Sequence, residues 1–435
     1  MMQLYVLKYK MMCGKISPIR RRLYIKSEEA FEILKKYNKD EFHIRHALTV
    51  EGVMRYFAKE LNENVEYWGN IGLLHENCIQ KNTARMEEYM IERIKWIDIL
   101  RAIAIIFVVI GHTLTEGEVQ TYFYSFHIPL FFFISGMLFK NKEEKFATFL
   151  IKKIKQLLVP YFCFGIVSIL IYAILGKFAA NSLGRGNIDG NILMNVLGLL
   201  YGSAKTGHLK YNLPLWFLPC LFSTNIIFYF AIKILKENKI IILVPICAAL
   251  GYAINYHTNI SCLPYGLDTA ITMLVFFSLG FLFSKNLEKA KAIYNNKFLI
   301  IGLTIITLAV GMLVGLKNGR VRYSADVYNN ILLFYISSIL SIIGYIGISV
   351  IINKCKFLEY IGQKTLAILV MHKMPILFFQ IAIPYTKNAL AQNNLIIGIV
   401  VAIISILLCL VANIIIEKYL PFLYGKWYKN KSQVT

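Results

Sequence analysis

Long apolar blocks constrain the fold of this chain more than any other feature of its sequence. Hydrophobic residues make up 57% of its 435 residues, which is more than a soluble chain of this length usually carries. Several blocks approach the ~20 residues that a helix needs to cross a bilayer, among them "LLVPYFCFGIVSILIYAIL", "LIIGLTIITLAVGMLVGL" and "LIIGIVVAIISILLCLVANIII". The sequence therefore predicts an all-α, polytopic membrane protein.

About ten membrane spans are expected after a small, helical, cytoplasmic N-terminal segment of residues 1–92. The expected spans lie near residues 97–115, 122–139, 157–175, 215–235, 240–254, 269–284, 298–316, 330–352, 365–383 and 395–416. The fifth and sixth are short, so a re-entrant segment is an alternative to either one. An integral-membrane domain is thus expected over residues 93–425, followed by a cytoplasmic tail of residues 426–435.

The distribution of basic residues predicts the orientation in the membrane. A net charge of +22 would indicate a nucleic-acid partner in a soluble chain, but here lysine and arginine gather in short loops beside the apolar blocks. One alternate set of loops is rich in lysine, whereas the other set is poorer, although residues 177–210 and 317–322 also contain basic side chains. Because cytoplasmic loops carry the excess of Lys and Arg, we expect a multi-pass cell-membrane protein with both termini in the cytoplasm and no nucleic-acid partner.

The cysteines and the first residues of the chain indicate no metal site, disulfide framework or signal peptide. The eight cysteines are scattered and form no CxxC pair, so neither a disulfide framework nor a metal site is predicted. The opening residues, "MMQLYVLKYKMMCGK", lack the ordered basic, apolar and small-residue regions of a signal peptide.

The stretch "RAIAIIFVVIGH" places Arg101 and His112 at the two ends of a run with no other ionisable residue. Eleven positions make almost three helical turns, so both side chains fall on one helix face, about 16 Å apart along the axis. Charge facing lipid is expensive, so this face is expected to point into the bundle, with Asp98 as the ion-pair partner of Arg101. Arg101 could instead snorkel to the interface, and His112 could be a hydrogen-bonding residue between helices. Their occurrence together favours a functional role.

Around these two residues the sequence resembles the family-3 membrane acyltransferases, which O-acylate bacterial surface carbohydrates. "RIKWIDILRAIAIIFVVIGH" is similar to the opening of that family, whose first helix carries an arginine and a histidine separated by ten residues. "SFHIPLFFFISGMLF", "LPLWFLPCLF" and "IGQKTLAILVMH" follow in the order of related sequences. The resemblance covers residues 93–425 and is greatest to the fucose 4-O-acetylase-like branch. It implies an O-acyltransferase, in the simplest case an O-acetyltransferase, acting on a cell-surface or exported carbohydrate.

After its second helix the family carries an R-x-x-R element, and here the sequence departs from it. "FLIKKIKQLLVPY" has Lys153 and Gln156 at these positions. Lysine attracts phosphate as a point charge but lacks the bidentate fork of arginine. Lys152 and Lys153 are therefore expected to help bind the acyl donor, with a positive flank on an interfacial helix as the alternative.

The resemblance implies acyl-CoA, in the simplest case acetyl-CoA, as the donor co-substrate, with no bound cofactor and no metal. Transfer to a sugar hydroxyl needs a base, and His112 is the expected base. Arg101 and the nearby lysines would hold the donor phosphates at the cytoplasmic edge, and the pantetheine arm would carry the thioester toward His112. The lipid bilayer, acyl-CoA and a carbohydrate acceptor are the expected partners, and both direct transfer and an acylated histidine stay open.

Three further residues are candidates for substrate binding. His127 is expected at the depth of His112, where it would orient the catalytic imidazole or bind acceptor hydroxyls, with a plain interfacial histidine as the alternative. His372 lies mid-span, where a polar group needs a partner, so functional and structural roles are balanced. Trp216 could stack on a sugar, although anchoring in the aromatic belt is the more frequent role of such a tryptophan.

The N-terminal segment "FHIRHALTVEGVMRYFAKELNENVEYWGNIGLLHEN" resembles the start of a soluble HD-type metal phosphohydrolase. His46 would be the first ligand, and His75 and Glu76 stand where that family has His-Asp. Such a site also needs a further Asp, and a helical fragment with an altered pair cannot assemble the metal centre. Residues 1–92 are therefore expected to be a truncated, non-catalytic fragment.

Two other functions stay open from the sequence. A transporter or flippase of a sugar or lipid-linked substrate would share the apolar blocks, but such proteins typically show repeated halves, and no internal repeat is visible here. A membrane-anchored phosphohydrolase sensor would depend on the N-terminal segment alone.

Overall fold

A computed structural model of the chain describes residues 27–37, 41–60, 64–140, 144–183, 192–207, 209–257, 262–287 and 296–426. Apart from one isolated bridge between Arg322 and Val327, the regular elements in these ranges are all helices. The expected all-α class is confirmed. The chain divides into two compact units, Met1–Arg93 and Ile94–Thr435.

The first unit contains α2 (Ser27–Tyr37), α3 (Glu41–Glu60) and the first part of α4 (Val65–Thr113). Its apolar core consists of four small or medium side chains, Ala30, Leu34, Ala47 and Leu73. Ala30 and Leu34 are one helical turn apart on α2, so they present one apolar stripe to the other two helices.

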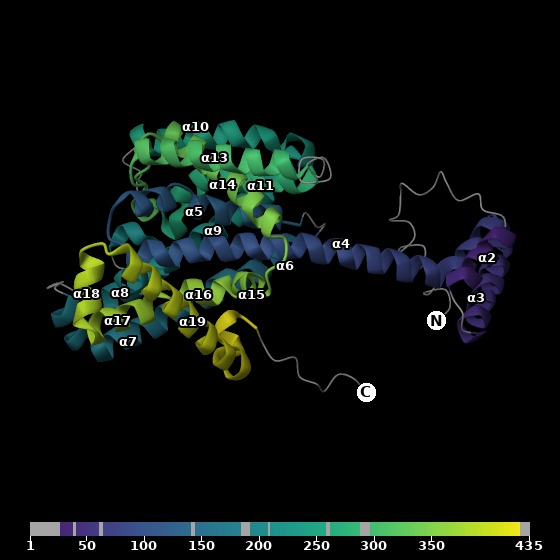
Figure 1. The fold of residues 1–435 in the computed structure, drawn as a ribbon, viewed down its shortest axis with the longest axis horizontal. Helices are drawn as coiled ribbons and strands as arrows, with labels where there is room; N and C mark the ends of the chain where they lie inside the picture. Colours follow the sequence, from purple (N-terminus) through teal and green to yellow (C-terminus); the bar gives the residue numbers. More distant parts are fainter. Residues whose placement is uncertain are drawn as a thin grey trace. The chain divides into compact units, whose positions relative to one another are not determined.

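The second unit is a layered helical bundle (Figure 1). Its longer helices are the last part of α4, α5 (Glu118–Met137), α7 (Val159–Leu183), α9 (Phe217–Leu235), α10 (Leu243–His257), α11 (Leu267–Lys285), α13 (Lys297–Asn318), α14 (Ile331–Ile352) and α19 (Leu395–Tyr419). Its shorter helices are α6 (Phe146–Lys153), α8 (Ile192–Tyr201), α15 (Lys356–Gln363), α16 (Thr365–Met371), α17 (Lys373–Ala382) and α18 (Pro384–Ala391). Helices α10, α11, α13 and α14 form one layer and α7, α8, α17, α18 and α19 another, with α4, α5 and α9 between them.

Short 3-10 and π-helical turns connect these helices. They are the π-helical turn η1 (Ile154–Leu158) and the 3-10 turns η2 (Ala204–Thr206), η3 (Lys210–Trp216), η4 (Glu237–Ile242), η5 (Pro264–Gly266), η6 (Tyr323–Ala325) and η7 (Pro421–Tyr424).

Eight segments of the described chain are long and apolar enough to cross a membrane. They are Lys95–Thr113, Phe146–Ile171, Asn212–Leu235, Glu237–Tyr256, Pro264–Lys285, Lys297–Asn318, Ile331–Ile352 and Leu395–Tyr419. The pair α16 and α17, bent by 41° at the break between them, would make a ninth.

The remaining expected span, residues 122–139, corresponds to α5, which is not among these segments. Helix α5 carries Gln120, Ser125 and His127, and all three side chains are buried inside the unit. These polar residues lower the mean hydropathy of α5. Most of its side chains are buried against neighbouring helices.

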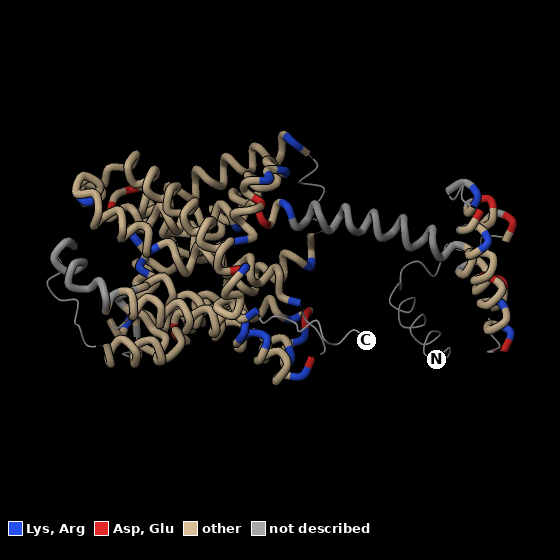
Figure 2. The backbone as a smooth tube through the Cα atoms, turned by 90° about the horizontal axis from the view of Figure 1, so that it is seen from below, with Lys and Arg blue, Asp and Glu red and all other residues tan. Residues whose placement is uncertain are grey.

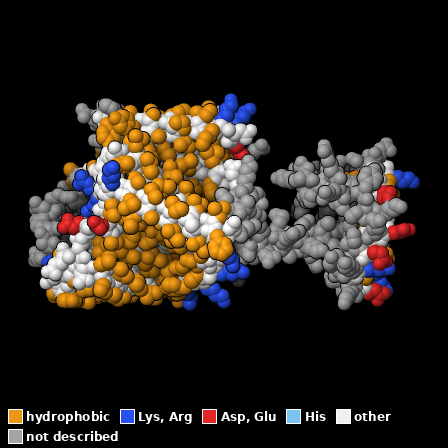
Figure 3. Space-filling model, turned by 45° about the horizontal axis from the view of Figure 1, so that its top comes forward, with side chains coloured by type: hydrophobic (Ala, Val, Ile, Leu, Met, Phe, Trp, Pro, Cys, Tyr) orange, Lys and Arg blue, Asp and Glu red, His pale blue; other side chains and the backbone are white. Residues whose placement is uncertain are grey.

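The surface of the second unit is that of a protein surrounded by lipid. Figure 3 shows a broad hydrophobic surface with Lys and Arg near its ends, and Figure 2 shows long stretches of helix without an acidic or basic residue. Phe298 and Ile396 are 91% and 75% exposed. Monomeric soluble proteins rarely expose apolar patches of such extent, so the chain is a multi-pass membrane protein.

Helices α5 and α11 meet backbone to backbone. A Cβ atom on Gly136 would lie 1.9 Å from the carbonyl oxygen of Phe277, and one on Gly280 would lie 2.0 Å from that of Phe133. Each glycine thus faces the backbone of the other helix, which is how small residues let membrane helices approach closely. This contact fixes α5, the helix that carries His127.

We expect Gly280→Ala to destabilise the bundle by about 1–3 kcal/mol, because the added methyl overpacks a backbone contact. Gly302→Ala is the matched control, since nothing lies within 4 Å of the position that its Cβ would take. The check is thermal unfolding of the two variants in detergent. Equal unfolding midpoints for the two variants would contradict the close contact between α5 and α11.

Candidate active site

Arg101 and Asp98 form the ion pair that the sequence predicts. Arg101 Nη1 lies 3.1 Å from Asp98 Oδ1. The Asp98 side chain is 5% exposed and that of Arg101 32%, so the carboxylate is inside the bundle and the guanidinium reaches its edge. Gln363 Nε2 donates to the second carboxylate oxygen of Asp98 at 3.2 Å.

The motif "IGQKTLAILVMH" contacts α4 at both of its ends. Near its start, a Cβ on Gly362 would lie 1.8 Å from the carbonyl oxygen of Asp98, so only glycine allows this approach. At its end, the imidazole of His372 lies with its centroid 5.2 Å from that of His112. The segment from Gly362 to His372 therefore follows α4 from the ion pair to the histidine.

The structure brings together three histidines from distant parts of the chain. His112 contacts His372 directly, and it approaches Tyr124 with ring centroids 6.4 Å apart. Tyr124 is 4.8 Å from His127, which in turn lies edge-on to Tyr323 at 5.8 Å. His112 is half-buried, whereas His127 and His372 are buried. The expectation that His127 lies near His112 fits this arrangement.

Hydrogen bonds fix the tautomers of the two buried imidazoles. His372 Nδ1 lies 2.9 Å from the carbonyl oxygens of both Ile368 and Leu369, and His127 Nδ1 lies 2.5 Å from that of Phe123. Carbonyl oxygens only accept, so Nδ1 carries the proton in each neutral ring. His372 Nε2 is then a buried lone pair, and it has no hydrogen-bond partner among the described residues.

A cation-lined pocket lies beside the other end of this part of α4. Its volume is about 670 Å³, within the ~300–1,000 Å³ typical of ligand sites. It is lined by four lysines, Lys152, Lys155, Lys364 and Lys426, with Glu417 and with uncharged side chains that include Gln156 and Gln363. Gln363 connects the pocket to α4, because it is also the residue that bonds Asp98.

Two of the expected site residues lie elsewhere. Lys153 is not among the pocket-lining residues; its ammonium lies 5.9 Å and 5.5 Å from the ring centroids of Phe139 and Phe149. Trp216 is 9% exposed and belongs to the hydrophobic core, so its ring is not a free stacking surface. Both follow from packing that sequence spacing does not show.

Lys364 and Lys426 line the pocket without being expected there from the sequence. Lys364 stands inside "IGQKTLAILVMH", directly after Gln363, so its place in a recognised motif was the available signal. Lys426 offers no such signal, because it reaches the pocket only through the turn η7.

The N-terminal histidines form no metal centre in the part of the chain that the structure describes. No group of three or more His, Cys, Asp or Glu in a metal-binding arrangement occurs there. His46 is exposed on α3, and the side chains of His75 and Glu76 lie outside the described ones.

Comparison with known families identifies the family of this chain. Residues 94–414 match the acyltransferase 3 family, described as an acyltransferase domain. The chain belongs to this family. Comparison with curated proteins and with solved structures finds no match. The protein is thus a membrane-bound O-acyltransferase, which replaces the transporter alternative. The three histidines and Lys152, Lys155 and Lys364 lie within the matched residues, whereas Lys426 lies beyond them.

Substitution of His372 by asparagine separates its structural role from a chemical one. The asparagine amide can still donate to Ile368, so we expect the unfolding midpoint of the acyltransferase to change by only about 2–4 °C. The Nε2 lone pair is lost, and we expect acyl transfer to fall about 10²-fold or more. The measurements are thermal unfolding and acyl transfer in detergent, and full activity in His372→Asn would contradict a chemical role of Nε2.

Proposed function

We propose that this acyltransferase moves an acyl group, in the simplest case acetyl, from cytoplasmic acyl-CoA to a hydroxyl of a cell-surface or exported carbohydrate. The observation that carries the proposal is the pairing of His112 with His372 near the C-terminal end of α4, with the lysine pocket connected through Gln363 to Asp98, more than three helical turns earlier on the same helix. In this proposal residues 93–425 are the acyltransferase domain, which resembles the fucose 4-O-acetylase-like branch. Both termini lie in the cytoplasm, and the lysine pocket opens there.

The lysine pocket suits the phosphate-bearing end of acyl-CoA. Lys152, Lys155, Lys364 and Lys426 supply ammonium groups, which attract phosphate as point charges. Glu417 accepts hydrogen bonds from Lys364 and, at 3.0 Å, from Lys426. A bound phosphate would compete with this carboxylate for the same two lysines.

The contacts of Gln363 suggest the route between pocket and histidines. Gln363 lines the pocket and bonds Asp98, and Asp98 holds Arg101. In this proposal Arg101 contacts the donor where the donor leaves the pocket. The remaining distance to His112, about 16 Å along the helix axis, is comparable to the length of the pantetheine arm, so the thioester can reach His112 while the phosphates stay in the pocket.

At the histidine end the chemistry is the attack of an acceptor hydroxyl on a thioester. A ring nitrogen of His112 removes the hydroxyl proton as the oxygen bonds to the acyl carbon. The bond from that carbon to sulfur breaks, and CoA leaves as the thiol after taking the proton from His112. A centroid separation of 5.2 Å allows His372 Nε2 to orient His112 or the acceptor, and His127, beside Tyr124, would bind further acceptor hydroxyls.

For the N-terminal unit we propose a non-catalytic role. Residues 1–92 would be a truncated HD-like fragment, because its first candidate ligand, His46, is exposed to solvent on α3. Its histidines then serve as internal controls for those of the acyltransferase domain.

The proposal is tested by transfer of labelled acetyl groups from acetyl-CoA to glycan in cells that express the protein. We expect His112→Ala and Arg101→Ala to abolish labelling at wild-type expression, because one removes the base and the other the donor contact. His46→Ala is the matched histidine control and should retain full labelling. Full activity of His112→Ala would contradict the mechanism, and an effect of His46→Ala would contradict the non-catalytic fragment.

The lysine pocket gives a separate prediction on donor affinity. Each charged hydrogen bond is worth about 1.5–3 kcal/mol, so we expect Lys152→Ala and Lys364→Ala to raise the KM for acetyl-CoA by about tenfold or more. Lys153→Ala is the control, because Lys153 lies over two phenylalanine rings instead of lining the pocket. Its KM for acetyl-CoA should stay at the wild-type value, and equal effects of Lys153→Ala and Lys152→Ala would contradict the assignment of the pocket.

A further inference from the structure

Residues 319–330, which connect α13 and α14, form a loop with hydrogen bonds within its own backbone. Arg322 and Val327 form an antiparallel bridge with two backbone hydrogen bonds of 2.9 and 3.1 Å. Asp326 and Asn329 adopt left-handed backbone conformations, with φ of 51° and 55°, which Asp and Asn tolerate better than most residues. The two ends of the segment are joined, since Asn318 Nδ2 donates to the carbonyl oxygen of Tyr328 at 3.0 Å.

One side of the 319–330 segment lies on the histidine site. Arg320 Nη1 donates to the carbonyl oxygen of Thr115 at 2.9 Å, and its guanidinium lies 5.2 Å from the ring centroid of Tyr124. Tyr323 OH donates to the carbonyl oxygen of Tyr124 at 2.6 Å, while its ring meets His127 edge-on. Arg320 and Tyr323 thus contact the α4–α5 connection and the residues that line the site.

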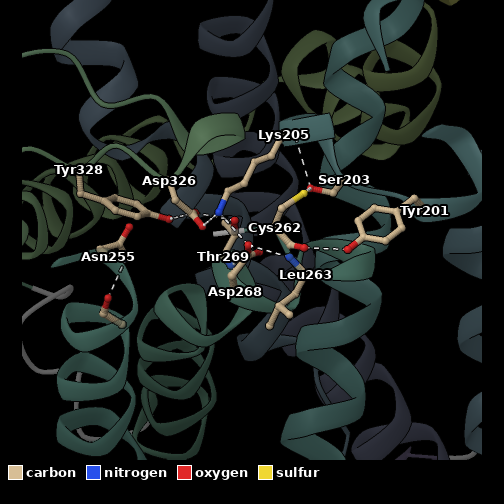
Figure 4. Close-up of polar contacts among 11 residues, drawn as sticks. Tyr201, Ser203, Lys205, Asn255, Cys262, Leu263, Asp268, Thr269, Asp326 and Tyr328 are labelled. Atoms are coloured by element: carbon tan, nitrogen blue, oxygen red, sulfur yellow. Dashed lines mark hydrogen bonds and ion pairs between the residues drawn. The ribbon is translucent and has the colours of Figure 1, made fainter. Parts of the chain in front are cut away.

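The other side of the segment is fixed to the bundle through a buried charge cluster (Figure 4). Lys205 Nζ, from the turn η2, bonds Asp268 Oδ2 at 2.7 Å and also bonds Asp326 Oδ2. The second oxygen of Asp326 accepts from Thr269 Oγ1 at 2.6 Å and from Tyr328 OH at 2.9 Å. Lys205, Asp268 and Asp326 are 11%, 0% and 7% exposed, so water does little to separate the two carboxylates.

The charges of this cluster depend on one another. Burial alone would lower the pKa of Lys205, but Asp326 and Asp268 outweigh it and raise that pKa above its ordinary value, so the ammonium form is held. Burial and the charge of Asp268 raise the pKa of Asp326. Without the ammonium, two buried carboxylates would face one another unpaired, an arrangement that is strongly unfavourable. Asp326 would then leave the cluster and carry the 319–330 segment with it.

We propose that Lys205 is a positioning residue of the acyltransferase, which clamps Asp326 to Asp268 and thereby keeps Arg320 and Tyr323 on the histidine site. The inference rests on the proposed function only in taking the histidine site as the place of acyl transfer. Lys205 bonds Asp326 of the 319–330 segment and acts on the histidine site through the contacts that Arg320 and Tyr323 of the same segment make there. The clamp keeps His127 covered and the α4–α5 connection in place while the donor end of the site is unaffected.

The test compares Lys205→Met with wild type in two measurements on the full chain. The first is the rate at which diethyl pyrocarbonate modifies His127, followed by mass spectrometry, which requires no acyltransferase activity. We expect this rate to rise about tenfold, because release of the segment uncovers a histidine that is now buried. The second is acetyl transfer from acetyl-CoA, in which we expect kcat to fall about 10²-fold through loss of alignment with an unchanged KM for acetyl-CoA.

Three variants make the outcome decisive. Lys205→Arg keeps a cation between the two carboxylates and should restore both values. Lys285→Met removes the ammonium that pairs with Glu237 at 2.8 Å, at the other end of α11, and should change neither value. Asp326→Asn keeps the oxygen that accepts from Thr269 and Tyr328 but puts an NH2 group, which cannot accept from the ammonium, in place of the oxygen that bonds Lys205. It should show both effects to a smaller degree, and it replaces Lys205→Met if that variant does not fold.

The proposal is overturned if His127 in Lys205→Met is modified at the rate seen in Lys285→Met, or if Lys205→Arg fails to restore it. Failure of the proposed function would look different. In that case His112→Ala would keep full acetyl transfer, while the modification rate of His127 would still respond to Lys205→Met.

Discussion

The contact of α4 with residues 361–372 is the interaction on which the rest of the structure depends. A membrane helix that carries a guanidinium and an imidazole must find partners for both. The segment supplies them from one continuous stretch, since Gln363 bonds the partner of Arg101 and His372 meets His112. Gly362 makes this possible, because any side chain there would collide with the backbone of Asp98.

His372 lies at the break between α16 and α17, where the two helices are bent by 41°. The Nδ1 proton of His372 is used to satisfy two carbonyl oxygens, and the opposite nitrogen is buried without a hydrogen-bond partner among the described residues. A buried unsatisfied nitrogen is costly, and the proposed function gives this one a use at the site of acyl transfer.

Features that depend on residues close together in the chain could be predicted from the sequence, whereas contacts between residues far apart in the chain could not. The helices, most of the spans and the pair of Arg101 with Asp98 follow from local spacing, which fixes a helix face without knowledge of its neighbours. Helix α5 is expected to be a span because its apolar residues dominate, but its polar side chains are buried and it is not among the segments that length and apolar composition alone identify. Its glycine contact with α11 puts it inside the bundle, a position that is compatible with crossing the membrane. Lys153 and Trp216 face aromatic and apolar neighbours for the same reason: packing decides which side of a short helix or turn faces a pocket.

Most of the contacts that could not be predicted join residues far apart in the sequence. Lys205 meets Asp326 across 121 positions and Gln363 meets Asp98 across 265, and no periodicity connects such residues. A motif can suggest that its residues matter, as "IGQKTLAILVMH" did for His372, without saying which side chain each one contacts.

In the proposed function one donor molecule spans the distance from the lysine pocket to His112. Two photoreactive acetyl-CoA analogues, one activated at the adenine and one at the acyl group, test this by mapping of the crosslinked peptides. We expect adenine crosslinks within residues 148–156 or 363–367, which contribute to the lining of the pocket, and acyl crosslinks beside His112 or His372. Crosslinks of both analogues to the pocket alone, or to the histidines alone, would contradict a donor that spans the two.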